Sequence, residues 1–209
     1  MTAALDVYAA SLDNTEPLIL HYRDGQTREL PVDVWTAVEV PGDRGLVDRC
    51  HGATLDIGCG PGRLVVAVAS RGLPALGVDI APGAVRLARA RGALAITRSI
   101  FADVPGHSRW NTALLADGNV GIGGDPVGLL RRIRDLLAPA GTVLVELDAP
   151  GTVSGRVDVR MEHAGELSGW FPWAHLAVEH GAVAAEAAGF KITESWMEEG
   201  RWFVALARG

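Results

Sequence analysis

The chain has 209 residues, of which 48% are apolar and 21% are charged, and its formal net charge is −6. This length and composition predict a globular chain with a substantial buried core, and they exclude an intrinsically disordered protein. The negative charge also disfavours DNA or RNA as a partner, because proteins that bind nucleic acids usually present a basic face.

The first residues and the cysteines bear on localisation. The segment MTAALDVYAASLDNTEP lacks the basic start and apolar stretch of a signal peptide, and no uncharged apolar run reaches the ~20 residues of a membrane span. Cys50 and Cys59 are too few for a four-ligand zinc site, so we expect no bound metal. A disulfide would strain the glycine-rich turn at Cys59, so we expect free thiols in a cytoplasmic protein.

Residues 1–45 predict a helix followed by a β-hairpin. Leu5, Tyr8 and Leu12 lie at helical spacing, and an Asp-Gly dipeptide separates the runs 18–22 and 27–34. We interpret this part as an N-terminal cap that lies outside the nucleotide-binding sheet.

The segment 54–79 has the order strand, glycine turn, helix and strand. An apolar run at 54–57 breaks into Gly-Cys-Gly-Pro-Gly at 58–62, a helical pattern follows at 63–70, and a second apolar run ends on Asp79. This order is typical of the first unit of a nucleotide-binding α/β sheet.

Each residue type in this unit has a physical reason. Gly58 and Gly60 allow backbone angles and close approaches that a Cβ atom would prevent. Gly62 lets the helix start pack tightly on the strand, where free N–H groups favour an anionic group. Asp79 ends the second strand, and its carboxylate can accept hydrogen bonds from both hydroxyls of a ribose.

The spacing of the glycines indicates which nucleotide is bound. A nicotinamide or flavin fingerprint is G-x-G-x-x-G and would place its third glycine at position 63, which is Arg63. The run G-x-G-x-G at 58, 60 and 62, preceded by Asp56, resembles the first motif of the class I S-adenosylmethionine-dependent methyltransferases. The resemblance covers about 46–209 and implies a Rossmann-like, doubly wound α/β sheet of about seven strands whose last strand is antiparallel.

The same resemblance implies S-adenosyl-L-methionine as cofactor and S-adenosyl-L-homocysteine as product. N-terminal additions in similar enzymes often cover the donor pocket, although for Tyr8, Tyr22 and Trp35, each taken singly, we favour a plain packing role. Many family members have an acid directly after the third strand for the adenine amino group, whereas this chain has Ser99 there and Asp103 a few places later. The residues that we expect around the donor are Tyr8, Asp56, Gly58, Cys59, Gly60, Gly62, Asp79, Ile80, Ser99, Ile100, Phe101, Asp117 and Gly118.

The remaining elements follow in a regular order. Helices are predicted at 43–51, 82–92, 126–138 and 173–188, strands at 93–98, 112–117, 142–147 and 156–161, and a closing hairpin at 190–197 and 201–207. Glu146 and Asp148 lie near the end of the fifth strand of the sheet. The cluster Gly-Trp-Phe-Pro-Trp at 169–173 suits either an apolar wall or lid of an acceptor site or plain core packing.

The segment after the fourth strand, which starts with Asp117 and Asn119, occupies the point where similar enzymes present residues to the reactive end of the donor. We therefore expect these two residues at the catalytic centre, with helix or loop capping as the alternative for Asp117. None of the six histidines lies in a local catalytic signature. The loop LLADGNVGIGGDP is similar to loops of bacterial methyltransferases.

The function predicted by the resemblance is in-line methyl transfer to a small-molecule acceptor through an O, N or C nucleophile. No N/D-P-P-Y/F run follows the fourth strand, which disfavours amino-methylation of adenine or glutamine. An NAD(P)-dependent oxidoreductase and a non-catalytic S-adenosylmethionine-binding protein remain as alternatives. The sequence leaves a monomer and a homodimer equally open.

Overall fold

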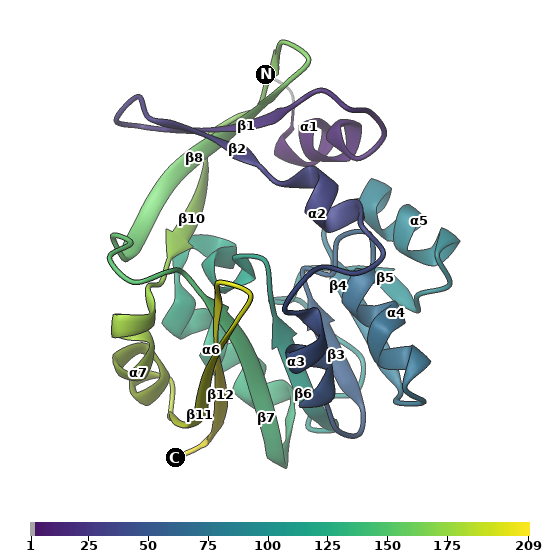
Figure 1. Cartoon of the computed structure of the whole chain (residues 1–209), viewed down its shortest axis with the longest axis vertical. Coiled ribbons are helices and arrows are strands. Elements are labelled where there is room, and N and C mark those ends of the chain that lie inside the picture. Colours follow the sequence, from purple (N-terminus) through teal and green to yellow (C-terminus); the bar gives the residue numbers. More distant parts are fainter. Residues whose placement is uncertain (1–2) are drawn as a thin grey trace.

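The chain forms two β-sheets, with helices on the larger one, in a computed structural model that describes residues 3–209. Figure 1 shows the larger sheet below and the smaller sheet above the ends of its strands. Within residues 3–209, no helix combines the length and apolar character that crossing a membrane requires. The helices are α1 (Ala4–Ser11), α2 (Val32–Thr36), α3 (Asp43–Asp48), α4 (Arg63–Ser70), α5 (Pro82–Ala90), the 3-10 segment η1 (Asn119–Gly124), α6 (Pro126–Leu136) and α7 (Val178–Ala187).

The larger sheet has the strand order β11-β12-β7-β6-β3-β4-β5. Its central strands pair in parallel, and β12 pairs antiparallel with both β7 and β11. This arrangement confirms the predicted doubly wound sheet of seven strands with a reversed last strand. Its strands are β3 (Thr54–Ile57), β4 (Ala75–Asp79), β5 (Ala95–Thr97), β6 (Trp110–Leu115), β7 (Leu137–Leu147), β11 (Phe190–Glu198) and β12 (Arg201–Arg208).

Helices cover both faces of this sheet because both faces are apolar. On one face, Leu129 and Ile133 of α6 and Ala185 of α7 pack with Ile57 and Val145 of the strands. The other face buries side chains of α3 and α4 against β6, β7 and β12, among them Leu46, Leu64, Leu114, Leu144 and Phe203. The two faces of each central strand are therefore buried, as expected for a parallel sheet.

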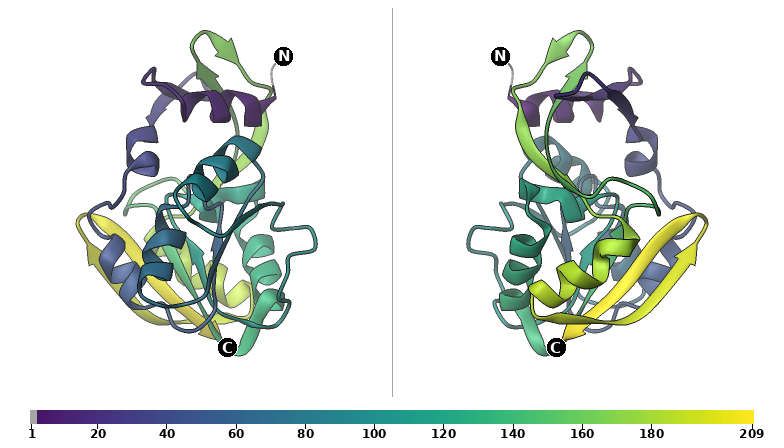
Figure 2. Two further views of the ribbon diagram at one scale, coloured as in Figure 1. Left: turned by 90° about the vertical axis from the view of Figure 1, so that its right-hand side faces the viewer. Right: turned by 90° about the vertical axis from the view of Figure 1, so that its left-hand side faces the viewer.

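The smaller sheet, which we name the cap sheet, has the order β10-β8-β1-β2, with β9 paired to β8. All its pairs are antiparallel, and the register sets Ile19 of β1 opposite Glu162 of β8 and Phe171 of β10 opposite Val159. Figure 2 shows this sheet and α1 crossing above the larger sheet in two views from opposite sides. Its strands are β1 (Leu18–Tyr22), β2 (Thr27–Leu30), β8 (Gly155–His163), β9 (Glu166–Leu167) and β10 (Phe171–His175).

The cap sheet is therefore built from two separate parts of the sequence. The predicted N-terminal hairpin forms, but it is completed by strands from 155–175, which the sequence assigned to the larger unit. The domain boundary between residues 45 and 46 remains a prediction. The cap sheet contains strands from before and from after this boundary.

Several boundaries differ from the prediction. The helix predicted from 173 begins at Val178, because Trp173 lies in β10 and pairs with Val157. Residues 32–36 form α2 instead of extending the hairpin, and β7 begins at Leu137, five residues earlier than predicted. The aromatic run at 170–173 hides the alternation of β10 because Phe171 and Trp173 on one face alternate with Pro172 and Ala174 on the other, and none of these four side chains is polar.

The cap is joined to the larger sheet through η1. A Cβ atom on Gly121 of η1 would lie 2.2 Å from the carbonyl oxygen of Ala174 and 2.5 Å from Nε1 of Trp173, both in β10. The close approach of η1 and β10 therefore requires a glycine at position 121.

We expect Gly121→Ala to lower the free energy of unfolding by about 1–3 kcal/mol, because overpacking forces the backbone of β10 away. Urea denaturation measures this loss. The matched control is Val183→Ala on α7, where the side chain is 69% exposed, and we expect a change within about 0.5 kcal/mol there. Equal stability of Gly121→Ala and the wild type would contradict the tight contact between η1 and β10.

Candidate functional site

The glycine turn between β3 and α4 requires its glycines. Gly58, Gly60 and Gly62 have φ angles of 71°, 50° and 82°, in the left-handed region that favours glycine. A Cβ atom on Gly58 would lie 2.8 Å from the side-chain amide of Asn119, and one on Gly62 would lie 2.8 Å from the Cβ atom of Ala88. The turn thus packs against η1 on one side and α5 on the other.

Hydrogen bonds fix the path of the turn. The N–H groups of Gly58 and Cys59 both donate to the carbonyl oxygen of Val78 in β4, at 2.8 and 3.1 Å. The Asn119 side chain donates to the carbonyl oxygens of Ile57 and Gly58, at 3.0 and 2.9 Å. Asn119, predicted to lie at the catalytic centre, therefore holds the first residues of the turn.

Asp79 lies at the end of β4 and faces the turn. Its Oδ2 atom accepts a hydrogen bond from the N–H of Gly60 at 2.9 Å, and its Oδ1 atom accepts one from the N–H of Ala81 at 2.8 Å. Each carboxylate oxygen keeps a second lone pair. Burial raises the pKa of Asp79, and the backbone N–H donors oppose that rise. The carboxylate can still accept from a vicinal diol.

Asp56 lies on β3 beneath the turn and is 3% exposed. Burial, followed by repulsion from the carboxylate of Asp117, raises the pKa of Asp56 to about 7, although Arg63 partly offsets the effect. A carboxyl group with this pKa changes its charge readily when a new charge approaches it.

The residues expected around the adenine divide into exposed and buried ones. Ile80 and Phe101 are 51% and 50% exposed, so both present apolar surface beyond the strand ends. Ser99 accepts a hydrogen bond from the N–H of Phe101 through its hydroxyl oxygen. The side chain of Ile100 is buried in the core of the sheet, so the exposed apolar pair here is Ile80 and Phe101.

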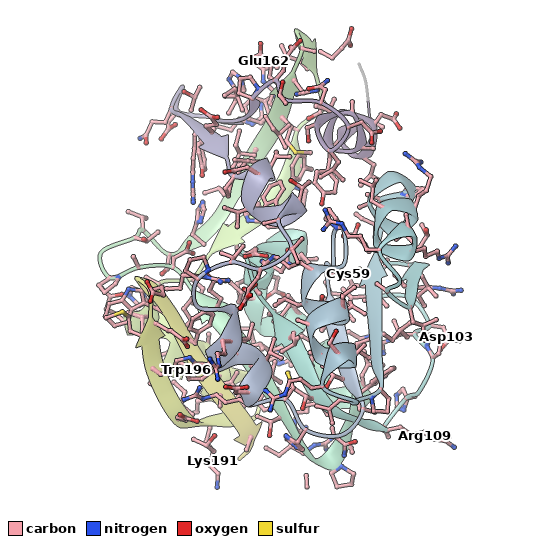
Figure 3. All side chains as sticks on the ribbon, turned by 45° about the vertical axis from the view of Figure 1, so that its right-hand side comes forward. Cys59, Asp103, Arg109, Glu162, Lys191 and Trp196 are labelled. Atoms are coloured by element: carbon pink, nitrogen blue, oxygen red, sulfur yellow. The ribbon has the colours of Figure 1, made fainter. Side chains whose placement is uncertain are left out.

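Two further predicted residues lie on opposite sides of the turn. The side chain of Cys59 packs against Gly77 and belongs to a buried apolar cluster between α4 and α5, so only its backbone faces the turn (Figure 3). Tyr8 of α1 approaches from the cap, where its hydroxyl would lie 3.1 Å from a Cβ atom at Gly60. Burial, and then the negative charge of Asp79, raises the pKa of Tyr8.

Asp117 is held by two guanidinium groups. Arg63 donates to its Oδ2 atom at 2.5 Å and Arg201 to its Oδ1 atom at 3.1 Å. The backbone of Asp117 has a φ of 55°, which is unusual for a residue other than glycine. Its N–H donates to Glu146 at 2.6 Å. Together these contacts fix both the backbone and the carboxylate of Asp117.

These residues belong to a larger ionic network that also includes Asp43. Arg63 donates to Oδ2 of Asp43, and Arg201 donates to Oδ1 of Asp43 at 2.9 Å. Arg201 also makes two hydrogen bonds to Glu146, at 2.8 and 2.9 Å. Arg63 and Asp43 are almost completely buried, and the other three are at most 21% exposed. We name Asp43, Arg63, Asp117, Glu146 and Arg201 the charge network.

The sequence analysis identified Asp117 but did not connect it to these partners. One signal was present: Arg63 is the first residue of α4, where the helix dipole disfavours a cation. A cation at that position needs carboxylate partners nearby. The identity of these partners depends on the fold, because the other members of the charge network come from α3, the end of β6, β7 and β12.

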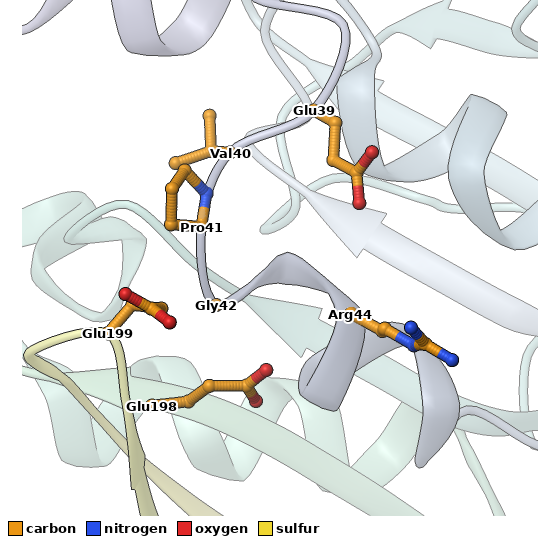
Figure 4. A pocket seen from close by; sticks show the side chains of 7 residues that line it. All are labelled: Glu39, Val40, Pro41, Gly42, Arg44, Glu198 and Glu199. Atoms are coloured by element: carbon orange, nitrogen blue, oxygen red, sulfur yellow. The ribbon is translucent and has the colours of Figure 1, made fainter.

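A pocket of about 370 Å³ lies outside the charge network, where the segment before α3 meets the β11–β12 turn. Figure 4 shows that its walls carry three acidic side chains and one arginine. A Cβ atom on Gly42 would lie 3.2 Å from the side chain of Arg201, which places the pocket beside the network and not above the glycine turn. Its lining residues are Glu39, Val40, Pro41, Gly42, Arg44, Glu198 and Glu199.

Comparison with known proteins identifies the central part of the chain. A family model described as a methyltransferase domain matches residues 54–141, which include the glycine turn, Asp79, Asp117 and Asn119. This segment of the chain is similar to a methyltransferase domain. The resemblance to the class I methyltransferases predicted from the glycine spacing is thereby confirmed, and the sheet order agrees with it.

Solved structures share the fold of this chain. A Bacteroides fragilis S-adenosylmethionine-dependent methyltransferase in complex with S-adenosyl-L-homocysteine aligns with a TM-score of 0.84 and 22% identity, over 100% of this chain and 97% of that one. The 1,6-didemethyltoxoflavin-N1-methyltransferase of Burkholderia thailandensis aligns with a TM-score of 0.61 and 18% identity, over 100% and 91%.

An amino pentose methyltransferase from Micromonospora echinaspora, with bound S-adenosylmethionine, aligns with a TM-score of 0.59 and 19% identity, over 80% of this chain and 90% of that one. No curated protein matches the chain in a sequence search. At these identities, the structural comparisons establish the fold of the chain.

We expect Arg201→Met to lower the free energy of unfolding by about 3–5 kcal/mol, because it leaves three buried or half-buried carboxylates with a single guanidinium. Denaturation in urea, and not in guanidinium chloride, measures the change in the free energy of unfolding. The control is Arg49→Met, which removes an exposed ion pair with Glu194 and should cost at most about 1 kcal/mol. A similar small loss in both variants would show that the charge network does not stabilise the fold.

Proposed function

We propose that the protein transfers a methyl group from S-adenosyl-L-methionine to a small molecule and releases S-adenosyl-L-homocysteine. One observation carries the proposal: the glycine turn and the Asp79 carboxylate face each other at the carboxyl ends of β3 and β4, within a segment that matches a methyltransferase domain. Ligands of open α/β sheets bind at this edge.

The proposed donor site assigns a task to each part of the turn. Asp79 accepts the ribose hydroxyls, and Gly58, Gly60 and Gly62 allow the backbone to approach the methionine part closely. Ile80 and Phe101 provide exposed apolar surface for the adenine ring. Asp56, with a pKa near neutrality, faces the α-amino group of the donor from below the turn.

Asp117 and Asn119 act in this proposal by positioning. Both oxygens of Asp117 are engaged by arginines, and the Asn119 amide holds the turn, so neither side chain is free to remove a proton. Since S-adenosylmethionine supplies an activated methyl group with a neutral leaving group, catalysis needs mainly alignment and exclusion of water. Such positioning can supply ~7–11 kcal/mol of a barrier.

A small-molecule acceptor is supported by the cap. Five aromatic side chains of intermediate burial belong to one apolar cluster of the cap: Tyr8, Tyr22, Trp35, Phe171 and Trp173. Aromatic walls of this kind suit small, largely apolar ligands. The Burkholderia and Micromonospora proteins are described as a 1,6-didemethyltoxoflavin-N1-methyltransferase and an amino pentose methyltransferase.

We also propose that the protein is a bacterial cytoplasmic enzyme, a monomer or homodimer, that has no nucleic-acid partner. Its net charge of −6 and the two buried free thiols of the described chain support this proposal.

A melting experiment separates the proposed cofactor from a nicotinamide cofactor. S-adenosyl-L-homocysteine at 100 times its dissociation constant should stabilise the fold by about 2.7 kcal/mol and raise the melting temperature, whereas NADH should leave it unchanged. A rise with NADH alone would overturn the proposed function. Arg63 occupies the position of the third glycine of the nicotinamide fingerprint, so we expect stabilisation by S-adenosyl-L-homocysteine and not by NADH.

We expect Asp79→Ala to weaken S-adenosyl-L-homocysteine binding by about 1–3 kcal/mol, because the ribose hydroxyls lose their acceptor. Titration calorimetry measures the affinity. Asp103→Ala, at an exposed loop position after β5, serves as the control and should bind like the wild type. Unchanged affinity in Asp79→Ala would exclude the ribose contact.

Donor binding should release protons near pH 6–7, and this release should depend on Asp56. Without ligand, the raised pKa keeps this carboxyl largely protonated below pH 7. The positive α-amino group of the donor would favour the charged form and lower the pKa, so up to about one proton leaves. Calorimetry of S-adenosyl-L-homocysteine binding in buffers of different ionisation enthalpy counts the protons, and Asp56→Asn should abolish the release. Proton uptake in the wild type would contradict the assignment.

A further inference from the structure

Three polar side chains form a chain of contacts between the cap sheet and the larger sheet. The hydroxyl of Tyr22, at the end of β1, lies 3.1 Å from Nε2 of His175 in β10. The Nδ1 atom of His175 lies 3.5 Å from Oδ2 of Asp148, which directly follows β7. We name Asp148, His175 and Tyr22 the relay; Figure 1 shows the three strands from which they come.

The contacts determine the protonation state of the imidazole. The pKa of Asp148 is lowered by its contacts with His175 and the N–H of Leu176, against the opposing effect of burial, so this carboxylate is charged at neutral pH. A charged carboxylate only accepts hydrogen bonds, so the tautomer that satisfies both contacts carries its proton on Nδ1 of His175 and leaves the Nε2 lone pair for the Tyr22 hydroxyl. This orientation is the one that a carboxylate gives to a histidine acting as a base.

Backbone contacts fix Asp148 where the two sheets meet. Its N–H donates to the carbonyl oxygen of Leu176 at 2.9 Å, and its Oδ2 atom accepts from the N–H of Leu176 at 2.8 Å. The imidazole is thus held between the end of β7 and the end of β10. Arg28 of β2 is a further charged group that lowers the pKa of Asp148.

The relay faces the same side of the cap sheet as its aromatic cluster. Tyr22 lies opposite Val159, which in turn lies opposite Phe171. His175 follows Trp173 by two residues and shares its face of β10. The same cluster includes Tyr8, whose hydroxyl lies beside Gly60 of the donor turn.

The relay also remains accessible. The side chains of His175 and Asp148 are 14% and 20% exposed, and Tyr22 is half-buried. Trp173, which adjoins His175 on this face, touches Gly121 of η1, the segment that begins with Asn119 on the donor turn. Contacts through Trp173 and η1 therefore link the relay to the donor turn.

We propose that Tyr22, His175 and Asp148 remove the proton of the acceptor during methyl transfer, and that the acceptor is a small planar molecule with an acidic O–H group. The proposal rests on the proposed methyltransferase function. A neutral amine attacks with its own lone pair and can lose its proton to water afterwards, whereas a hydroxyl must lose its proton before or during attack. A base positioned in the site is therefore needed for the hydroxyl.

The step balances as follows. The acceptor oxygen uses an electron pair to form the new bond to the methyl carbon, and the carbon–sulfur bond breaks with its electron pair on sulfur. The acceptor proton passes to the oxygen of Tyr22, while the proton of Tyr22 passes to Nε2 of His175. Asp148 stabilises the resulting imidazolium, which returns its extra proton to solvent. The products are the methyl ether, neutral S-adenosyl-L-homocysteine and one proton.

Turnover tests the relay directly. The acceptors are small phenols and hydroxylated heteroaromatic compounds, with benzylamine and an amino sugar as comparators, and S-adenosyl-L-homocysteine formation is measured. We expect wild-type turnover with O–H compounds. His175→Gln and Tyr22→Phe should each lower kcat about 10²–10⁴-fold without changing the KM for S-adenosylmethionine, and their rates should recover at high pH, where the acceptor ionises by itself.

The chain offers a matched control on the same strand. His21 of β1 places its Nε2 atom 2.7 Å from Glu162, so it is also a histidine paired with a carboxylate. It alternates with Tyr22 and lies on the opposite face of the cap sheet, and Figure 3 shows Glu162 at the far end of the cap. His21→Gln should keep the wild-type kcat and pH profile.

A second measurement is independent of the acceptor. Nitrogen-15 NMR of histidine-labelled protein with bound S-adenosyl-L-homocysteine should show His175 as the neutral ring protonated at Nδ1, and Asp148→Asn should change that tautomer. Wild-type protein protonated at Nε2 would overturn the proposal.

The remaining outcomes are distinguishable. Wild-type kcat in both relay variants, methylation of the amines alone, or no turnover of the panel by protein that binds S-adenosyl-L-homocysteine would each overturn the relay. Failure of that compound to raise the melting temperature would instead overturn the proposed function.

Discussion

The charge network is the interaction on which the geometry of the site depends. Arg63 and Arg201 hold Asp117 in a left-handed backbone conformation, and the same arginines hold Asp43, the first residue of α3. Five side chains from separate segments thus meet where β6, β7 and β12 adjoin the start of α4. Because isolated buried charges are expensive, these segments are stable only together. The position of the segment after β6 is therefore set by electrostatics as much as by packing.

Several residues that contact a ligand in the proposed site also hold the protein together. Asp79 closes the turn through the N–H of Gly60, and Asn119 closes it from the other side through Ile57 and Gly58. The turn therefore has its binding shape before any ligand arrives. Such preorganisation reduces the entropy lost on binding. Residues that a motif marks as functional thus also have structural tasks.

The sequence predicted the fold of the larger sheet well, because its signals are local. The glycine spacing at 58–62, the helix 63–70 and the carboxylate at 79 each follow from neighbouring residues. The cap was predicted only in part, because β1 and β8 pair across more than a hundred residues. The charge network around Asp117 joins five distant segments, and the relay of Tyr22, His175 and Asp148 joins three. No local sequence pattern predicts either set of contacts.

The cap sheet has a consequence for the order in which the protein can be built. Ile19 pairs with Glu162, so the hairpin made first on the ribosome finds its neighbouring strand only after most of the chain has been synthesised. A lone hairpin is marginally stable in water. The apolar face of Leu18 and Leu20 is thus without its final cover during most of translation. Closure of the cap sheet waits for β8 and β10, which follow β3 to β7 of the larger sheet in the chain but precede β11 and β12.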